Sequence, residues 1–157
     1  MLIDDFNNAK IGNPFETLGL QKVEGKEGYL LRAWLPDAKS VDVYPLKGKK
    51  KICSLSMVHE DGLFEEYLEV KKPFNYKFKV EYKDTTIEVI DPYQFRDEAF
   101  YGLNTMNEDP ENIYKTLGAQ LIEIEVDGVK IKGTKFAVYA PSASAVSVIG
   151  DFNFWDG

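Results

Sequence analysis

The strict alternation of apolar and charged residues from Tyr76 to Lys83 is the feature that most restricts the fold. The segment reads YKFKVEYK, so every second side chain is Tyr, Phe or Val and the others are Lys or Glu. Successive side chains of a β-strand point to opposite faces of a sheet, whereas an α-helix repeats every 3.6 residues. The pattern therefore predicts a half-buried strand and argues against a helix at this place.

Other short segments of the same kind surround this strand. A turn at Asp84 followed by residues 86–90 predicts its hairpin partner. Earlier segments rich in β-branched and aromatic residues, separated by Pro, Asp and Gly turns, cover 29–35, 40–44, 52–57 and 63–70. Residues 2–11 predict one short N-terminal helix. Short strands at roughly ten-residue spacing indicate an all-β fold, an Ig-like antiparallel β-sandwich.

Composition and charge limit the possible partners. The chain carries a net charge of -7, which argues against nucleic acid, because such binding depends on Lys and Arg displacing counterions. The sequence lacks an apolar run long enough to span a membrane, and its N-terminus lacks the profile of a signal peptide. The lone Cys53 cannot form an internal disulfide, so we expect a reducing, cytoplasmic location. We expect no cofactor, and His59, without Cys or His partners, predicts no metal site.

The chain repeats part of its own sequence. Thr-Leu-Gly occurs at 17–19 and again at 116–118. Six further positions recur 105 residues later, where Leu31, Trp34, Pro36, Ala38, Val41 and Val43 correspond to Phe136, Tyr139, Pro141, Ala143, Val146 and Val148. Repetition on this scale predicts two related modules. We expect a first β-sandwich module with its helix over 1–106, a linker over 107–111, and the opening strands of a second, similar module over 112–157.

The apolar residues near the end of the sequence need other residues to cover them. Val146 and Val148 predict a strand, Gly150 and Asp151 a turn, and the residues that follow are mostly large and apolar. The second copy supplies only the strands that match the first third of the module. We therefore expect this chain to be a piece of a longer protein, and residues 112–157 to be unable to bury their own apolar face.

Several strings resemble the N-terminal region of glycogen (1,4-α-glucan) branching enzymes. The most specific are DGLFE at 61–65, DPYQF at 91–95 and GDFNFW at 150–155, and the similarity covers nearly all of the chain. The resemblance implies two sandwich modules of the starch- and glycogen-binding type ahead of a catalytic (β/α)8 barrel. It also implies a non-catalytic part of a transferase of glycogen biosynthesis, which positions α-glucan (glycogen, amylose) or supports the barrel.

The same resemblance implies carbohydrate-binding residues. In related glycogen-binding modules a stacking tryptophan ends a Gly-x-Phe-Asn-x-Trp string, and a lysine in Tyr-Lys-Phe assists it. Trp155, with Asn153, matches the string in the second module, and Lys77 matches the lysine in the first. Glu88 stands three residues before Asp91, where a second tryptophan is expected. Neither module therefore holds the complete set.

The acidic residues do not lie in catalytic motifs. Retaining transglycosylation needs two carboxylates about 5 Å apart astride the glycosidic bond. We interpret Asp61, Asp84, Glu88 and Asp91 as turn formers and solvated charges, and we expect no catalytic residue. Trp34 is interpreted as a packed ring in the first place and as a sugar platform in the second. A rival hypothesis stays open, namely a stand-alone Ig-like protein-interaction module without a sugar role.

Overall fold

The chain divides into two compact units. The structure is a computed structural model, and it describes residues 2–7, 11–100, 103, 110–153 and 155. The first unit contains Met1–Arg96 and Val126–Val129, and the second contains Asp97–Glu125 and Lys130–Gly157. Within the expected linker over 107–111, residues 107–109 lie outside the described residues.

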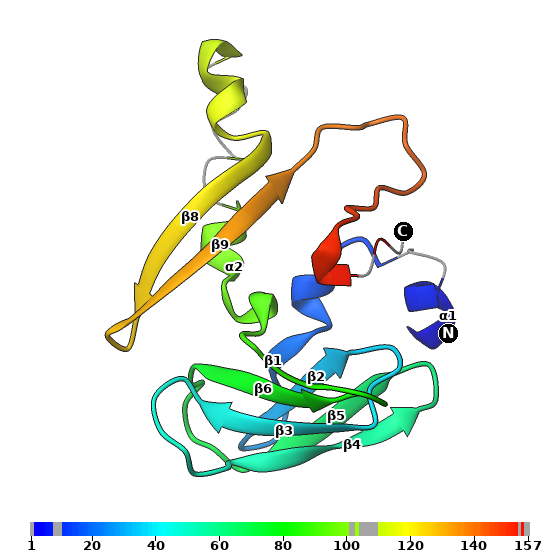
Figure 1. Cartoon of the computed structure of the whole chain (residues 1–157), viewed down its shortest axis with the longest axis vertical. Coiled ribbons are helices and arrows are strands. Elements are labelled where there is room, and N and C mark those ends of the chain that lie inside the picture. Colours follow the sequence, from blue (N-terminus) through cyan, green and yellow to red (C-terminus); the bar gives the residue numbers. More distant parts are fainter. Residues whose placement is uncertain (1, 8–10, 101–102, 104–109, 154, 156–157) are drawn as a thin grey trace. The chain divides into compact units, whose positions relative to one another are not determined.

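Seven antiparallel strands build the first unit. They are β1 (Gly19–Lys22), β2 (Tyr29–Trp34), β3 (Ser40–Pro45), β4 (Cys53–His59), β5 (Leu63–Leu68), β6 (Tyr76–Glu81) and β7 (Thr86–Val89). They form one sheet in the order β1-β2-β5-β4-β3-β6-β7. The sheet curls over, so that β2 and β5 lie in one layer and β3 and β6 in the other (Figure 1). The predicted all-β antiparallel fold is confirmed.

Strand β4 joins the two layers. Its residues 53–55 pair with β3, and its residues 56–59 pair with β5. The register of the second pairing shifts between Met57 and His59. An irregularity of this kind bends a strand and increases its twist, which helps one strand to serve both layers. The sandwich is therefore continuous along β4 instead of consisting of two separate sheets.

The core lies between the layers and is filled from alternate strand positions. Tyr76, Phe78 and Val80 of β6 are buried, whereas Lys79 and Glu81 are exposed, as the alternation predicts. The buried cluster also contains Leu31, Ala33, Ala38, Val41, Val43, Leu55, Phe64 and Leu68. Burying one large apolar side chain contributes about 1.5–3 kcal/mol. Contacts across the two layers are therefore the main source of stability in this unit.

The helical segments differ in part from the prediction. Of the expected helix over 2–11, α1 covers Leu2–Asn7 and Ile11 is not helical, while residues 8–10 lie outside the described part. A 3-10 helix, η1 (Pro14–Glu16), precedes β1, and η2 (Pro92–Gln94) and α2 (Arg96–Phe100) follow β7. Among the residues that the structure describes, no helix has the length and apolar character that a membrane crossing requires.

The second unit is built on one long hairpin. Strands β8 (Gly118–Val126) and β9 (Val129–Ala137) pair with each other, after the 3-10 helix η4 (Pro110–Lys115) and before η5 (Asp151–Asn153). The predicted strand around Val146 and Val148 is wrong, because residues 138–150 contain no strand. A strand needs a neighbour for its backbone hydrogen bonds. Among the described residues of this unit, no strand follows β9.

Much of the apolar surface of this unit is exposed. Leu121 is 89% exposed and Tyr139 is 72% exposed. The ring centroids of Phe136 and Phe152 lie 6.1 Å apart, yet Phe136 remains 45% and Phe152 66% exposed. Ala137 is the one buried hydrophobic residue among those described in the unit. These exposures agree with the expectation that residues 112–157 do not bury their own apolar face.

Candidate functional site

The loop from Gly150 to Trp155 is braced by its own hydrogen bonds. The Asn153 side chain accepts a hydrogen bond from the Gly150 N–H and donates one to the Val148 carbonyl, each at 2.9 Å. The backbone N–H groups of Asn153 and Trp155 both donate to the Gly150 carbonyl, at 3.1 and 2.9 Å. Asn side chains often stabilise turns through such local bonds. The predicted residue Asn153 therefore holds the shape of the loop that carries Trp155.

The Trp155 ring projects from this loop. The residue is 64% exposed, and its φ of +61° lies in the left-handed region that non-glycine residues rarely adopt. The indole N–H donates to a carboxylate oxygen of Asp151 at 2.8 Å. This bond orients the ring, which presents a flat apolar surface to solvent. A surface of this kind can stack against the apolar face of a sugar ring.

Lys77 lies on β6, in the first unit. Its ammonium group donates to the Glu88 carboxylate at 2.6 Å, and this hydrogen bond and charge lower the pKa of Glu88 below its usual value. The structure thus brings the predicted lysine into contact with the residue that stands in place of the second tryptophan. The pair lines a pocket of about 540 Å³ together with Tyr44 and Lys79. Polar hydrogen bonding is possible here, but stacking on an indole ring is not.

Asp91 forms a turn, as interpreted from the sequence, but the interpretation of its carboxyl as a solvated charge is wrong. Its side chain is 3% exposed, and it accepts hydrogen bonds from the Tyr76 hydroxyl and from the Tyr93 N–H. Burial raises the pKa of Asp91 from 3.8 to about 6, although both hydrogen bonds act in the opposite direction. Burial, together with the Asp91 charge, also raises the pKa of the Tyr76 hydroxyl. The carboxyl is a structural group whose ionisation costs free energy.

The string DPYQF fastens the last turn of the first unit to β6. Asp91 caps η2. The Gln94 side chain accepts from the Tyr76 N–H at 3.1 Å and donates to the Tyr76 carbonyl at 2.9 Å, in the manner of a strand neighbour. The Tyr93 ring packs edge-on against Phe15 with centroids 5.3 Å apart. Packing and hydrogen bonding therefore account for the place of this motif in the fold.

Trp34 is a packed ring. Phe6 of α1 stacks on it with ring centroids 4.8 Å apart and an angle of 9° between the planes. The contact favours the first of the two interpretations of this tryptophan and gives α1 its anchor on the first unit.

Two further reactive side chains, His59 and Cys53, lie in the described part of the first unit. The Nδ1 atom of His59 lies 3.5 Å from a carboxylate oxygen of Asp61. Burial and the nearby charges of Glu66 and Asp42 raise the pKa of the Cys53 thiol to about 11, which disfavours the reactive thiolate. Within the described part of the chain, no group of three or more His, Cys, Asp or Glu is arranged to hold a metal ion.

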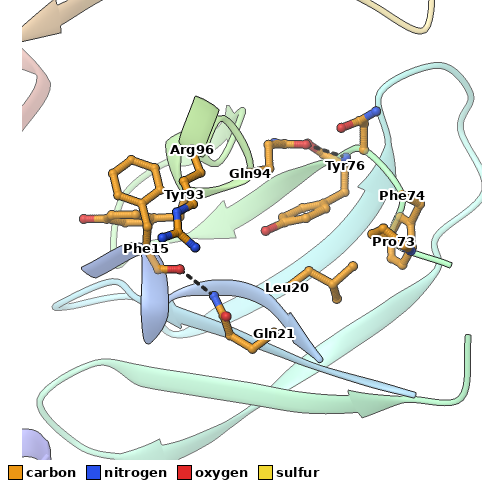
Figure 2. Close-up of a pocket in the computed structure, with 10 residues that line it drawn as sticks. Phe15, Leu20, Gln21, Pro73, Phe74, Tyr76, Tyr93, Gln94 and Arg96 are labelled. Atoms are coloured by element: carbon orange, nitrogen blue, oxygen red, sulfur yellow. Dashed lines mark hydrogen bonds between the residues drawn. The ribbon is translucent and has the colours of Figure 1, made fainter. Parts of the chain in front are cut away.

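One cavity was not foreseen from the sequence. It measures about 410 Å³ and belongs to the first unit. Figure 2 shows an opening between two groups of side chains, with Phe15, Tyr93 and Arg96 on one side and Pro73 and Phe74 on the other. Three separate segments, 15–21, 73–76 and 93–96, supply its lining. Because these segments meet only in the folded chain, no local pattern could reveal the cavity.

The curled seven-stranded antiparallel sheet defines the first unit as a small β-sandwich module. Residues 116–157 match a family model described as carbohydrate-binding module 48 (isoamylase N-terminal domain). Residues 2–93 match the model for the N-terminal domain of the alpha-1,4-glucan branching enzyme GlgB. The chain belongs to this family of GlgB N-terminal domains.

Relatives align along nearly the whole chain. The 1,4-alpha-glucan branching enzyme GlgB of Pseudoalteromonas atlantica is 44% identical over 96% of this chain and 21% of its own length. The enzyme of the same name from Shewanella sp. (strain MR-4) is 35% identical over 95% of this chain and 20% of its own length. The chain therefore spans about a fifth of the relatives that it matches.

A solved structure shows a weaker likeness. It is the catalytic module of the glycogen-degrading pneumococcal virulence factor SpuA in complex with an inhibitor. The two sequences are 21% identical, and the match covers 59% of this chain and 14% of the SpuA chain. The TM-score of 0.39 is too low to establish a shared fold.

Proposed function

We propose that the chain is the non-catalytic N-terminal part of a 1,4-α-glucan branching enzyme, which transfers α-1,4 chains to α-1,6 branch points in glycogen biosynthesis. The proposal rests on one observation, the order in which the two family models match, at 2–93 and then at 116–157. The relatives that carry the name of this enzyme align with both parts. This match favours a branching enzyme over a stand-alone interaction module.

The two matches also support the proposed division of the chain. One model ends at residue 93 and the other begins at residue 116, on either side of the proposed linker over 107–111. We assign 1–106 to the first module and 112–157 to the second. In the parent protein, both modules position α-glucan or support a catalytic barrel in the cytoplasm.

We assign the glucan contact of the second module to Trp155. Its support is the exposed ring, the Asp151 hydrogen bond that orients it, and the loop that Asn153 braces. Glucose rings present flat apolar faces, so an oriented aromatic ring can hold a glucan chain without charge. Lys77 of the first module contributes a hydrogen bond to a sugar hydroxyl, in exchange for part of its contact with Glu88.

Trp155→Ala in the full-length parent protein is expected to weaken its affinity for maltoheptaose. Stacking a planar ring on an aromatic side chain contributes about 1–3 kcal/mol in nucleic-acid complexes. A similar or somewhat smaller value for a sugar predicts a Kd about 5- to 100-fold higher. Isothermal titration calorimetry measures the change. Tyr114→Ala is the matched control, because it removes another exposed ring of the second unit, 69% exposed, outside the loop. Equal losses in both variants would contradict the assignment to Trp155.

The chain of residues 1–157 alone is expected to show no branching activity on amylose. Retaining transglycosylation needs two carboxylates about 5 Å apart in a substrate cleft. Asp91, the one buried charged side chain among the described residues, is instead held by Tyr76 and Tyr93. The absorbance of the amylose–iodine complex reports branching, and the GlgB of Pseudoalteromonas atlantica serves as the positive control. A shift in absorbance with the chain alone would refute its non-catalytic role.

A further inference from the structure

We propose that the cavity between Phe15, Phe74 and Arg96 is a second glucan subsite, which takes one or two glucose units of an α-1,4-glucan. The class of ligand rests on the function proposed above. The site itself is new to that function, because it uses neither Trp155 nor Lys77. It lies wholly within the first unit, which lacks the stacking rings of the related modules.

The size of the cavity suits a short piece of a sugar chain. Its volume of about 410 Å³ falls in the lower part of the range of about 300–1,000 Å³ that is usual for small-molecule sites. The cavity is open to solvent between its two walls (Figure 2). A glucan can therefore place an internal segment or an end in it while the rest of the chain stays in solvent.

Aromatic rings form both walls, and their neighbours hold them in place. On one side Phe15 and Tyr93 meet edge to face, with centroids 5.3 Å apart and planes at 71°. On the other side Phe74 packs against the buried Tyr76 ring at 5.8 Å and 63°. Rings fixed in this way lose little conformational freedom when a ligand binds. They supply the apolar surface that a glucose ring needs.

Polar groups at the cavity can meet the sugar hydroxyls. The Nε2 group of Gln21 donates to the carbonyls of Phe15 and Leu18, which fixes the amide and leaves Oε1 as an acceptor. The Arg96 side chain is 59% exposed, and its guanidinium lies at the long distance of 4.0 Å from the Glu16 carboxylate. A guanidinium offers several planar donors and a carboxamide oxygen accepts. Together they match a ligand whose hydroxyls both donate and accept.

The charge of the lining favours a neutral ligand. Arg96 is the one charged residue among those that line the cavity, and Glu16 partly balances it. Phosphate groups are usually bound by several cationic or backbone donors at once. Aromatic rings and amides predominate here instead, which is the lining expected for a neutral polyhydroxylated ring.

The test is a titration of the full chain of residues 1–157 with maltotriose, followed by ¹H–¹⁵N NMR. We expect the amide signals of residues 15–21, 74–76 and 93–96 to shift in a saturable manner. Phe74→Leu keeps apolar bulk against Tyr76 but removes the flat ring, and Arg96→Gln removes the guanidinium. Each variant is expected to raise the Kd read from these signals about threefold to tenfold, as for one aromatic or polar contact. Lys83→Gln, at an exposed lysine in the β6–β7 turn, is the matched control.

The outcomes separate this proposal from the assignment of Trp155. The indole N–H signal of Trp155 in the same spectra reports the second module, so either site can respond without the other. Absence of shifts at the cavity signals would overturn the subsite, as would shifts that neither Phe74→Leu nor Arg96→Gln weakens. Shifts at the cavity with inorganic phosphate but not with maltotriose would identify an anion site and refute the glucan assignment.

Discussion

The first unit is expected to be about 3 kcal/mol less stable above pH 6 than below pH 4 because of Asp91 alone, and Asp91→Asn is expected to remove this difference. In the folded chain the pKa of Asp91 is about 6, whereas its ordinary value is 3.8. Between these values the folded state binds more protons than the unfolded state. The stabilisation is therefore complete below pH 3.8 and is lost as the pH rises through 6. The difference between these two pKa values, at about 1.4 kcal/mol per unit, gives the expected loss of about 3 kcal/mol in the free energy of unfolding.

Asparagine isolates the ionisation from the hydrogen bonds. Its carboxamide has the shape of the carboxyl, can still accept from the Tyr93 N–H, and carries no charge at any pH. Urea unfolding at several pH values from 3.5 to 7.5 (about half a pH unit apart) yields the free energy of unfolding of each protein. The control is Asp84→Asn, because Asp84 is an exposed carboxylate in a turn and should keep the wild-type profile. Parallel profiles for wild type and Asp91→Asn would show that burial does not govern this carboxyl.

Gly62→Ala is expected to destabilise the first unit by about 2–6 kcal/mol. Gly62 has a φ of +103°, and a Cβ atom there would lie 2.5 Å from the Leu35 carbonyl oxygen and 2.6 Å from the Pro36 Cα. The Gly62 carbonyl also accepts the Leu35 N–H at 2.8 Å, so the two loops are tied together. Backbone strain of this type costs about 1–3 kcal/mol, and forcing atoms into a packed site costs about as much again.

A second glycine separates strain from overlap. Gly25 also has a positive φ, +72°, but nothing lies within 4 Å of its Cβ position. Gly25→Ala should therefore cost about 1–2 kcal/mol, the penalty of the left-handed conformation alone. Urea unfolding monitored by circular dichroism compares the two variants. If both lose the same stability, the close approach of Leu35 to Gly62 contributes nothing. The close packing of Leu35 and Pro36 thus explains why a glycine occupies this position of the DGLFE string.

Local patterns predicted most strands of the first unit, most clearly where alternate side chains of a strand are buried, as in β6. Alternation along Tyr76, Phe78 and Val80 appears in the sequence and recurs as buried side chains of β6. β1 was not predicted, since residues 19–22 carry no clear alternation. This strand lies at the edge of the sheet, beside β2. An edge strand can form through backbone hydrogen bonds with its neighbour, even where its side chains show no alternation that would predict a strand.

The same kind of pattern failed in the second unit. Val146 and Val148 resemble Val41 and Val43, which pair with both β4 and β6. The described residues of the second unit contain no equivalent neighbours, and the segment 138–150 forms no strand. A β-branched run favours extended backbone, but the sheet hydrogen bonds come from other strands.

The candidate site was partly predictable. The Trp155 loop was found by its string of residues, because the Asn153 and Asp151 contacts that orient the ring lie within a few residues of it. The contact of Lys77 with Glu88 joins two strands of a hairpin. In the sequence, only the resemblance to glycogen-binding modules pointed to these two positions. The cavity beside Phe74 and Arg96 left no trace in the sequence.

The sequence by itself determined the strands with a strong alternation and the family, because these depend on neighbours along the chain or on characteristic strings. Tertiary structure alone decided that β4 serves both layers, that Asp91 is buried against Tyr76, and that three distant segments enclose a cavity. Burial is the physical reason for the difference. Whether a carboxyl is solvated or a ring is covered depends on residues far away in the sequence, which come together only when the sheet curls over.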